Sequence, residues 1–403
     1  MKYYSLSECV SIQRGLTFKK SDVVDNSNFR VLRSNNIDYE TYSFIDKDFS
    51  YLNPNLEIED KYFTKKNDII ICMSTGSKKH LGKTALVSSN SKYVVGGFLS
   101  KISANEEIIN SKYLFYFLKN PKTIKLIHSS VSSMTINNLR KDVLNNLQIP
   151  VPSLREQEKI VERLDKVLHD VDIAIETTEK NIKNIEDLYL SKSVNIFDSL
   201  AESFDNIYLN DACKVERGSS PRPIKQFITN DVTGVNWIKI GDIKEGEKYV
   251  TQTKEKITIA GSKKSRQVKK GDLILTNSMS YGRPYIMDID GYIHDGWFVL
   301  RLSENVETEY FYYLLSSPFV QKQFHSLAAG SVVKNISGDL LKKTKVIIPT
   351  LDHQLQTSEK LTEISKNTNR FMEINNLKIN KLKILKSSIL NKFFSVESTS
   401  TNT

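Results

Sequence analysis

The sequence predicts an α+β protein of two mixed α/β domains, related by a pseudo-two-fold axis and separated by an antiparallel pair of long coiled-coil helices. Two observations predict this fold: a repeat that relates the two halves of the 403-residue chain, and a seven-residue apolar pattern that follows each half. Each copy of such a repeat is one structural unit. Two copies in one chain can therefore mimic a dimer.

The repeat is clearest in a proline-led segment. Residues 152–157 read PSLREQ, and residues 349–354 read PTLDHQ, 197 positions later. Upstream, the same spacing aligns the aromatic segments 113–121 and 310–318 without a gap. Two-fold objects suit a two-fold ligand, and double-stranded DNA is the commonest such ligand.

Each copy begins with a strand-rich domain. The apolar runs at 68–73 and 272–276 are short and are flanked by Gly, Asn and Ser, which is typical of buried strands. The aromatic segments 113–119 and 310–315 are predicted to be short helices packed under the sheet. Each domain is predicted to end in an extended strand that leads into a proline, Pro150 in the first copy and Pro349 in the second. The strand is expected to be extended there because a residue before proline is kept out of the helical region.

A long helix follows the first domain. Ser153 and Glu156 have the spacing of a capping box, and no glycine or proline occurs from there to residue 197. A strict seven-residue apolar repeat predicts a left-handed coiled-coil seam on a helix roughly 65 Å long. The residues of this seam are Leu154, Val161, Leu168, Ile175, Ile182, Tyr189 and Ile196.

The second long helix has a weaker seam, in which Thr368 and Asn375 interrupt the apolar positions. A polar residue at a seam position costs stability but can fix the register. The apolar positions are Leu361, Ile364, Phe371, Leu382, Leu385 and Ile389. The two apolar stripes are most simply buried against each other, and a pseudo-two-fold relation requires the helices to run antiparallel.

The chain is therefore expected to have five segments. The C-terminal tail is rich in Ser and Thr, which predicts disorder. The segments are a first domain at 1–150, a long helix at 151–198, a second domain at 199–348, a second long helix at 349–395 and a disordered tail at 396–403.

Composition favours a polyanionic partner. The chain has 57 Lys and Arg against 47 Asp and Glu, a formal charge of +10. Its three cysteines (Cys9, Cys72 and Cys213) form no CxxC pair, which fits a reducing cytosol and small buried side chains. The first residues lack a signal-peptide pattern, and no apolar run approaches the roughly 20 residues that span a membrane. We expect a cytoplasmic protein.

The loop at 76–84 (GSKKHLGKT) resembles a phosphate-binding loop, but five residues separate its glycines where that motif has four. The other copy has Gly282, Arg283 and Pro284 at the comparable place, and proline there disfavours a following helix. Two interpretations remain: a turn that needs a positive φ at glycine, and a basic loop that faces DNA.

Residues 254–270 form the densest basic stretch, which fits either a solvated surface loop or a phosphate-contacting loop. The sequence does not divide basic residues between phosphate and base contacts. The predicted DNA-binding residues are Lys78, Lys79, Lys83, Lys263, Lys264, Arg266, Tyr281 and Arg283.

Catalytic motifs are missing from the sequence. It has no Asn-Pro-Pro-Tyr type tetrapeptide, and its six histidines never adopt a metal-binding spacing such as HExxH. His128 and His325 match across the copies and are expected to be packed side chains. A binding protein is favoured over an enzyme. The alternatives are a stand-alone enzyme dependent on a nucleotide or S-adenosylmethionine, and a coiled-coil scaffold that does not bind DNA.

Two strand-rich domains, each followed by a proline-led long helix, resemble the specificity (S) subunit of type I restriction-modification systems. The most specific match is Pro152-x-Leu154-x-Glu156-Gln157-x-x-Ile160 at the start of the first long helix. The Gly-Lys and Gly-Arg loops after an Asp-Ile or Asp-Leu strand are also similar. The likeness covers nearly the whole chain, and it departs from the family at His353, where the family has glutamate.

The resemblance implies that each domain is a target recognition domain for one half of a split DNA sequence, with the helix pair setting the spacer. It also implies docking of two methyltransferase subunits, which use S-adenosylmethionine to methylate adenine, and of restriction subunits that use ATP and Mg. No cofactor, metal or catalytic residue is expected in this chain. The docking residues it implies are Pro152, Leu154, Glu156, Gln157, Ile160, Pro349, Leu351 and Gln354.

Overall fold

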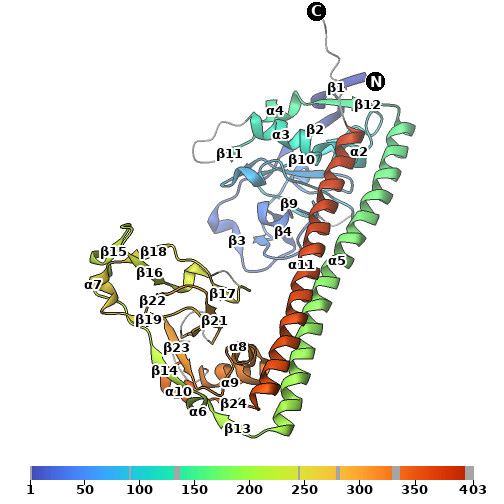
Figure 1. Cartoon of the computed structure of the whole chain (residues 1–403). Helices are drawn as coiled ribbons and strands as arrows, with labels where there is room; N and C mark the ends of the chain where they lie inside the picture. The colour runs from blue at the N-terminus through green and yellow to red at the C-terminus, as the bar shows by residue number, and fades with distance from the viewer. Residues whose placement is uncertain are drawn as a thin grey trace, which may run out of the picture. The chain divides into compact units, whose positions relative to one another are not determined.

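The computed structural model of the protein describes residues 2–89, 92–130, 137–243, 246–277, 282–328 and 336–394. The chain divides into two compact units, residues 1–178 with 377–403, and residues 179–376 (Figure 1). The predicted tail at 396–403 lies outside the described residues. No described helix is long and apolar enough to cross a membrane.

The first unit contains two principal sheets. One is antiparallel, in the order β2 (Val10–Arg14), β10 (Leu99–Ala104), β6 (Ile69–Cys72), β8 (Thr84–Leu86). The other has the order β3 (Val23–Val24), β5 (Ser50–Leu52), β4 (Phe29–Leu32), β9 (Val94–Val95), with β4 and β9 parallel. Two short antiparallel pairs complete the unit, β1 (Lys2–Ser5) with β12 (Gln148–Val151), and β7 (Ser74–Thr75) with β11 (Asn137–Asn138).

Strand β6 lies at the centre of the first unit, as its apolar run predicts. Its alternate side chains enter two different cores, as expected for a buried strand. Ile69 and Ile71 join a core that includes Tyr113, whereas Ile70 and Cys72 join a core beside the second sheet. The short helices are α1 (Leu6–Cys9), α2 (Ser111–Leu118), α3 (Pro121–Ser129), α4 (Lys141–Asn145) and the 3-10 helices η1 (Lys20–Asp22), η2 (Ser34–Asn36), η3 (Asp60–Tyr62) and η4 (Lys78–His80).

The second unit repeats this plan with longer sheets. The first sheet has the order β14 (Cys213–Arg217), β23 (Trp297–Leu302), β20 (Leu273–Thr276), β21 (Pro284–Met287), β17 (Tyr249–Val250). The other has the order β15 (Ile228–Thr229), β18 (Glu255–Ile257), β16 (Val235–Ile238), β22 (Gly291–Ile293), β19 (Arg266–Val268). Strands β13 (Asn206–Tyr208) and β24 (Lys345–Ile347) pair as β1 and β12 do. The short helices are α6 (Leu209–Ala212), α7 (Ile259–Ser262), α8 (Thr308–Ser316), α9 (Pro318–Ala328), α10 (Gly338–Lys342), η5 (Ile224–Gln226) and η6 (Ile240–Asp242).

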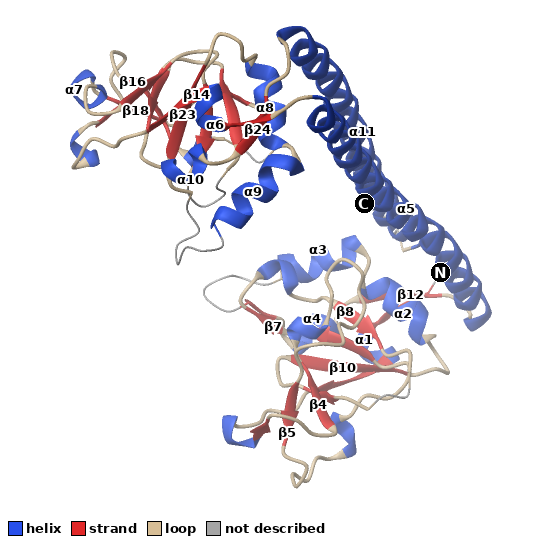
Figure 2. Cartoon of the chain, turned by 90° about the horizontal axis from the view of Figure 1, so that it is seen from below, coloured by secondary structure: helices blue, strands red, loops and turns tan. Residues whose placement is uncertain are grey.

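Two long helices, α5 (Leu154–Ser203) and α11 (Leu351–Phe393), each contribute to both units (Figures 1 and 2). Helix α5 continues beyond the predicted end at 198. In the first unit, Asp172 of α5 accepts a 2.6 Å bond from Lys386 of α11. In the second unit, the ring centroids of Phe204, the residue directly after α5, and His353 of α11 are 5.2 Å apart. Later residues of α5 thus meet earlier residues of α11, and the helices run antiparallel. The predicted fold class is confirmed.

The seam of α5 largely follows the predicted repeat, although Leu154 at its start is 38% exposed. In α11 the predicted phase is wrong in two places, because Phe371 is 56% exposed and Leu385 is 47% exposed. The half-buried positions there include Thr368 and Asn375, the two polar residues of the seven-residue series. Phe371 and Leu385, each three positions after a member of this series, therefore face outward.

The two glycine loops are turns with a left-handed glycine, as one of the two interpretations requires. Gly82 has φ +76° and Gly282 has φ +78°, and the strands β8 and β21 follow. A Cβ added at Gly82 would lie 3.1 Å from Cγ2 of Ile127 on α3. A strand follows the loop where a phosphate-binding loop needs a helix, so the resemblance to that motif is superficial.

Gly82→Ala is expected to lower the free energy of unfolding of the first unit by about 1–2 kcal/mol, the cost of a left-handed L-residue. Crowding against Ile127 adds to this cost. Urea unfolding followed by circular dichroism measures the effect. Gly76→Ala in the same loop is the matched control, because no atom lies within 4 Å of its added Cβ. Equal effects of the two substitutions would contradict the assignment.

Candidate nucleic-acid interface

The first long helix starts with the predicted capping box. The Ser153 hydroxyl and N–H donate to Oε2 of Glu156 at 2.9 and 3.1 Å, and the Glu156 N–H donates to Ser153 Oγ at 3.4 Å. These bonds hold the pKa of the exposed Glu156 carboxyl below its usual value. In the second copy, Thr350 Oγ1 lies 2.7 Å from Nδ1 of His353. A side-chain contact between the matched positions therefore persists despite the departure at His353.

Two residues predicted to dock partner proteins are buried inside the two units instead. Gln157 and Gln354 are both 0% exposed, and their amides hydrogen-bond backbone groups of their own units. A polar side chain in an apolar setting is retained only where it finds such partners. Both glutamines are therefore structural in this conformation, which corrects the prediction.

The other predicted docking residues differ in accessibility. Leu154 and Leu351 are 38% and 45% exposed. Glu156 is exposed, whereas Pro152 and Ile160 are half-buried. Pro349 is buried and offers no surface for a partner. The two exposed leucines are the best-placed members of the predicted set.

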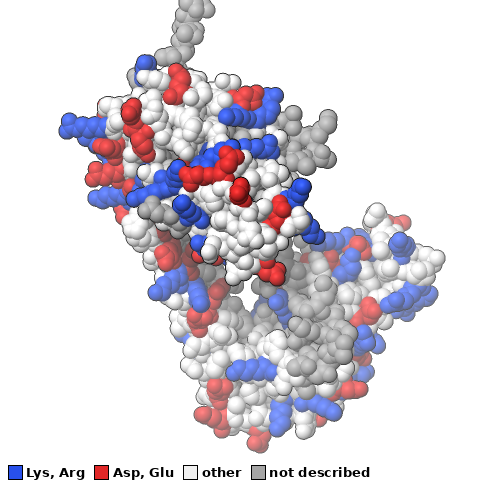
Figure 3. All heavy atoms as spheres, turned by 180° about the vertical axis from the view of Figure 1, so that it is seen from behind, with Lys and Arg blue, Asp and Glu red and all other residues white. Residues whose placement is uncertain are grey.

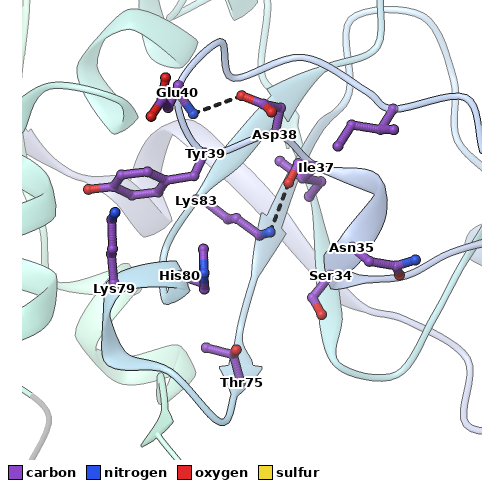
Figure 4. A pocket seen from close by; sticks show the side chains of 11 residues that line it. Ser34, Asn35, Ile37, Asp38, Tyr39, Glu40, Thr75, Lys79, His80 and Lys83 are labelled. Carbon is purple, nitrogen blue, oxygen red and sulfur yellow. Dashed lines mark hydrogen bonds between the residues drawn. The ribbon is translucent and has the colours of Figure 1, made fainter. Parts of the chain in front are cut away.

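The basic residues of the first glycine loop separate into two groups. Lys78 and Lys79 are exposed on η4. Lys83 is only 6% exposed, and its Nζ donates to the carbonyl of Ile37 at 2.8 Å (Figure 4). Burial holds the pKa of Lys83 below its usual value. Lys83 thus supports the loop after η2, and its prediction as an outward-facing DNA contact needs correction.

Beside this loop lies the first-domain cavity, of about 540 Å³. Figure 4 shows Lys79, His80 and Lys83 on one side and the loop of Asp38 and Tyr39 on the other. Nζ of Lys79 is 5.2 Å from the Tyr39 ring centroid, and the Tyr39 and His80 rings meet edge to face. Burial and the neighbouring lysines lower the pKa of His80. Hydroxyl and amide groups of Ser34, Asn35 and Thr75 complete a mixed polar lining.

In the second unit, the predicted residues Lys263, Lys264 and Arg266 are all exposed next to β19. Lys264 Nζ lies 4.8 Å from the Phe227 ring centroid, and Arg266 is 3.7 Å from a Glu216 oxygen. Arg283 is exposed after Gly282. Tyr281 lies outside the described residues.

A second-domain cavity, of about 820 Å³, was not predicted from the sequence. Its cations come from Arg222, Lys225 and Lys239, and its aromatic lining from Trp237 and His294. The remaining lining residues are Ser220, Pro221, Pro223 and Ile224. Cations beside an apolar and aromatic floor suit a nucleic acid, which offers phosphates to the former and base faces to the latter.

Fixed hydrogen bonds hold this cavity in shape. Asp295 accepts from Ser220 Oγ at 2.7 Å and lies 3.3 Å from Arg222, and the Ser220 bond chiefly holds its pKa below the usual value. Nδ1 of His294 accepts from the Gly296 N–H at 2.7 Å. Burial of the His294 ring lowers its pKa, so the neutral ring is favoured. No local motif could have revealed the cavity, since three separate segments build it.

Charge is not gathered into one large basic patch on the face shown in Figure 3, where Lys and Arg lie interspersed with Asp and Glu. Local groupings, such as the three cations of the second-domain cavity, are therefore better guides to an interface than the net charge of +10.

A comparison with models of protein families identifies the family of this chain. The model of the type I restriction modification DNA specificity domain matches twice, at residues 1–186 and 202–383. The chain belongs to this family. Its two copies correspond to the two halves of the repeat, and the prediction of a specificity subunit rather than a catalytic one is confirmed.

Specificity subunits of known systems align with the chain. It is 23% identical over 422 residues to the type I restriction enzyme EcoKI specificity subunit of Escherichia coli strain K12, covering 98% of this chain and 88% of that protein. The MjaVIII specificity subunit of Methanocaldococcus jannaschii is 25% identical over 327 residues, covering 74% and 72%.

Solved structures share the fold. A chain described under "Structural basis underlying complex assembly and conformational transition of the type I R-M system" superposes with a TM-score of 0.78 at 17% identity, covering 97% of this chain and 96% of that chain. The HsdS subunit from Thermoanaerobacter tengcongensis gives a TM-score of 0.56 at 18% identity, covering 98% and 96%.

The specificity subunit is expected to lose stability on acidification through His294. The pKa of His294 is lower in the folded state than in the unfolded state, where it is about 6.5. Below about pH 6.5 the unfolded state therefore binds more protons, and the free energy of unfolding falls as the pH drops. In His294→Asn, the Asn oxygen can still accept from Gly296 but does not titrate. As the pH is lowered from about 7.5 to about 5.5, the melting temperature of the wild type should fall more steeply than that of His294→Asn. Parallel pH profiles would count against a buried neutral His294.

Proposed function

We propose that this chain is the DNA-reading subunit of a type I restriction-modification complex, in which each domain reads one half of a bipartite target in double-stranded DNA. The double match to the DNA specificity domain, at 1–186 and 202–383, carries the proposal. Both copies share sheet order and glycine turns, so both can serve the same task on different bases.

The long helices set the spacer between the half-sites in this proposal. At 1.5 Å per residue, the 50 residues of α5 amount to about 75 Å, roughly two turns of DNA at about 34 Å each. Bases between two domains held by such a helix pair would remain unread.

We assign the DNA contacts to groups on both domains. The second-domain cavity supplies Arg222, Lys225 and Lys239, and the first-domain cavity supplies Lys79 and Asn35. Lysine and arginine neutralise phosphates, whereas asparagine and arginine can also pair with base edges. Predicted residues that remain candidates are Lys78, Lys79, Lys263, Lys264, Arg266 and Arg283.

The chain would act in the cytoplasm with partner enzymes. Two methyltransferase subunits would bring S-adenosylmethionine, and restriction subunits would bring ATP and Mg. Methylation of a base inside a duplex requires the base to be flipped into the partner's pocket, so the partner must be held against bound DNA. The exposed Leu154 and Leu351 support docking at the helix starts, because apolar side chains on a surface favour a protein contact.

Neutralising the second-domain cavity should weaken DNA binding and its salt dependence. Arg222→Gln with Lys225→Gln removes two phosphate contacts, so the slope of log affinity against log salt should fall by about 2. Fluorescence anisotropy of the assembled complex on target DNA at several salt concentrations measures this. Lys343→Gln, an exposed lysine after α10, is the control. An unchanged slope would exclude the cavity from the interface.

Exchange of residues 1–150 for the first domain of another specificity subunit should change one half-site and leave the other. Strand β1 and residues 148–150 of β12 lie within the exchanged segment, so the graft carries all but one residue of its closing strand pair. Sequencing of methylated adenines in cells that also express the methyltransferase partner measures both half-sites. Methylation at unchanged sites would refute the proposal, and DNA affinity without salt dependence, or none in the complex, would favour a scaffold that does not read DNA.

A further inference from the structure

A single buried amide joins α5 to the first recognition domain. Oε1 of Gln157 accepts from the N–H of Asn110 at 2.8 Å. Its Nε2 donates to the carbonyls of Ile108 at 3.0 Å and Pro152 at 2.9 Å. Both amide hydrogens are used, and the side chain is fully buried. The start of the long helix is thereby tied to the loop before α2.

In the second domain, Gln354 makes the same set of contacts, and we call each set a joint. Oε1 of Gln354 accepts from the N–H of Glu307 at 2.8 Å, and Nε2 donates to the carbonyls of Asn305 and Pro349, both at 2.8 Å. Every partner in both joints is a backbone group. The geometry is therefore independent of the loop side chains, which differ between the copies.

Tyrosines of the aromatic helices add matched contacts near each glutamine. The Tyr113 hydroxyl donates to the Pro150 carbonyl at 2.7 Å, and the Tyr310 hydroxyl to the Ile347 carbonyl at 2.8 Å. One turn further on, Tyr116 donates to Asp165 of α5.

The corresponding contact in the second copy joins Tyr313 to Thr362 of α11 at 3.1 Å. Several fixed points along one helix restrain its tilt as well as its rotation. Each long helix therefore leaves its domain in a defined direction.

We propose that Gln157 and Gln354 are positioning residues, which set the angle between each long helix and its recognition domain and so select the spacer length. The inference rests on the proposed function. A helix of about 75 Å turned by about 3° moves its far end by about 4 Å, close to the 3.4 Å rise of one base pair. A small change in the angle between helix and domain is thus enough to favour a spacer that is one base pair longer or shorter.

The test uses Gln157→Met, Gln354→Met and the double variant of the full chain, expressed with the methyltransferase partner. Methionine keeps the volume and removes all three hydrogen bonds. The DNA is a plasmid library in which the two half-sites are separated by spacers of varied length. Gln356→Met is the matched control, since Gln356 is exposed on α11 and its amide donates to Asp352 of the same helix at 2.9 Å.

The preference for the native spacer over one longer or shorter by one base pair should fall about tenfold in the double variant, the factor that one net hydrogen bond carries. Half-site base preferences should stay within about twofold, and the control should match the wild type. Hydrogen exchange of the free chain should show faster exchange at the Asn110 and Glu307 amides.

Unchanged spacer selectivity in folded variants would overturn the proposal, and so would altered half-site bases, because the glutamines would then act on recognition itself. Should the methionine variants fail to fold, Tyr116→Phe and Tyr313→Phe must relax spacer selectivity in the same direction, and their failure to do so would overturn it as well. Absence of any bipartite methylation by the wild type would instead remove the proposed function, and the spacer role with it.

Discussion

The structure depends on one constraint, which is that each long helix has an apolar stripe that it cannot bury alone. Antiparallel pairing at least partly buries most of the α5 stripe, and it buries α11 positions such as Leu361, Ile379 and Leu390. It also brings the end of α11 to the first unit, where Leu390 and Phe394 join the core around Leu164 and Leu168. The Phe394 ring lies 5.1 Å from that of Tyr113. The first unit is therefore built from two separate stretches of the chain, whereas the second is the continuous stretch 179–376.

This pairing has a consequence for folding. Burial of apolar area is the main source of stability, and the first core is incomplete without residues from the C-terminal end of α11. The first unit can therefore reach its full stability only after the C-terminal end of α11 has been synthesised. The duplicated chain thereby couples its two recognition domains through shared helices, although each sheet system is local to its own domain.

Periodic features of the fold could be predicted from the sequence, because they depend on local chemistry. The seven-residue series of α5, the buried run of β6 and the left-handed Gly82 are of this kind. Features that depend on tertiary contacts could not be predicted from the sequence. Lys83 looks like a surface cation until the carbonyl of Ile37 is placed beside it. In α11, apolar residues on both sides of the seam make its phase ambiguous, and Phe371 was assigned to the wrong side.

The candidate site was predicted only in part for the same reason. The exposed cations at 263, 264 and 266 lie within four residues of the sequence and are easy to find. Trp237 and His294, in contrast, reach the second-domain cavity from separate segments of the chain. The motif singles out Gln157, but its burial depends on the loop before α2, which no local pattern reveals.

In the proposed mechanism, recognition and spacing depend on different kinds of contact. The joints at Gln157 and Gln354 bind backbone groups, which every sequence provides. The cavities present side chains, such as Asn35 in the first domain and Arg222 in the second. Side chains of the cavities can therefore be replaced without altering the bonds that orient the helices. In this proposal, a bipartite reader can acquire a new half-site while it keeps its spacer, because the described hydrogen bonds of Gln157 and Gln354 involve no side chain of either cavity.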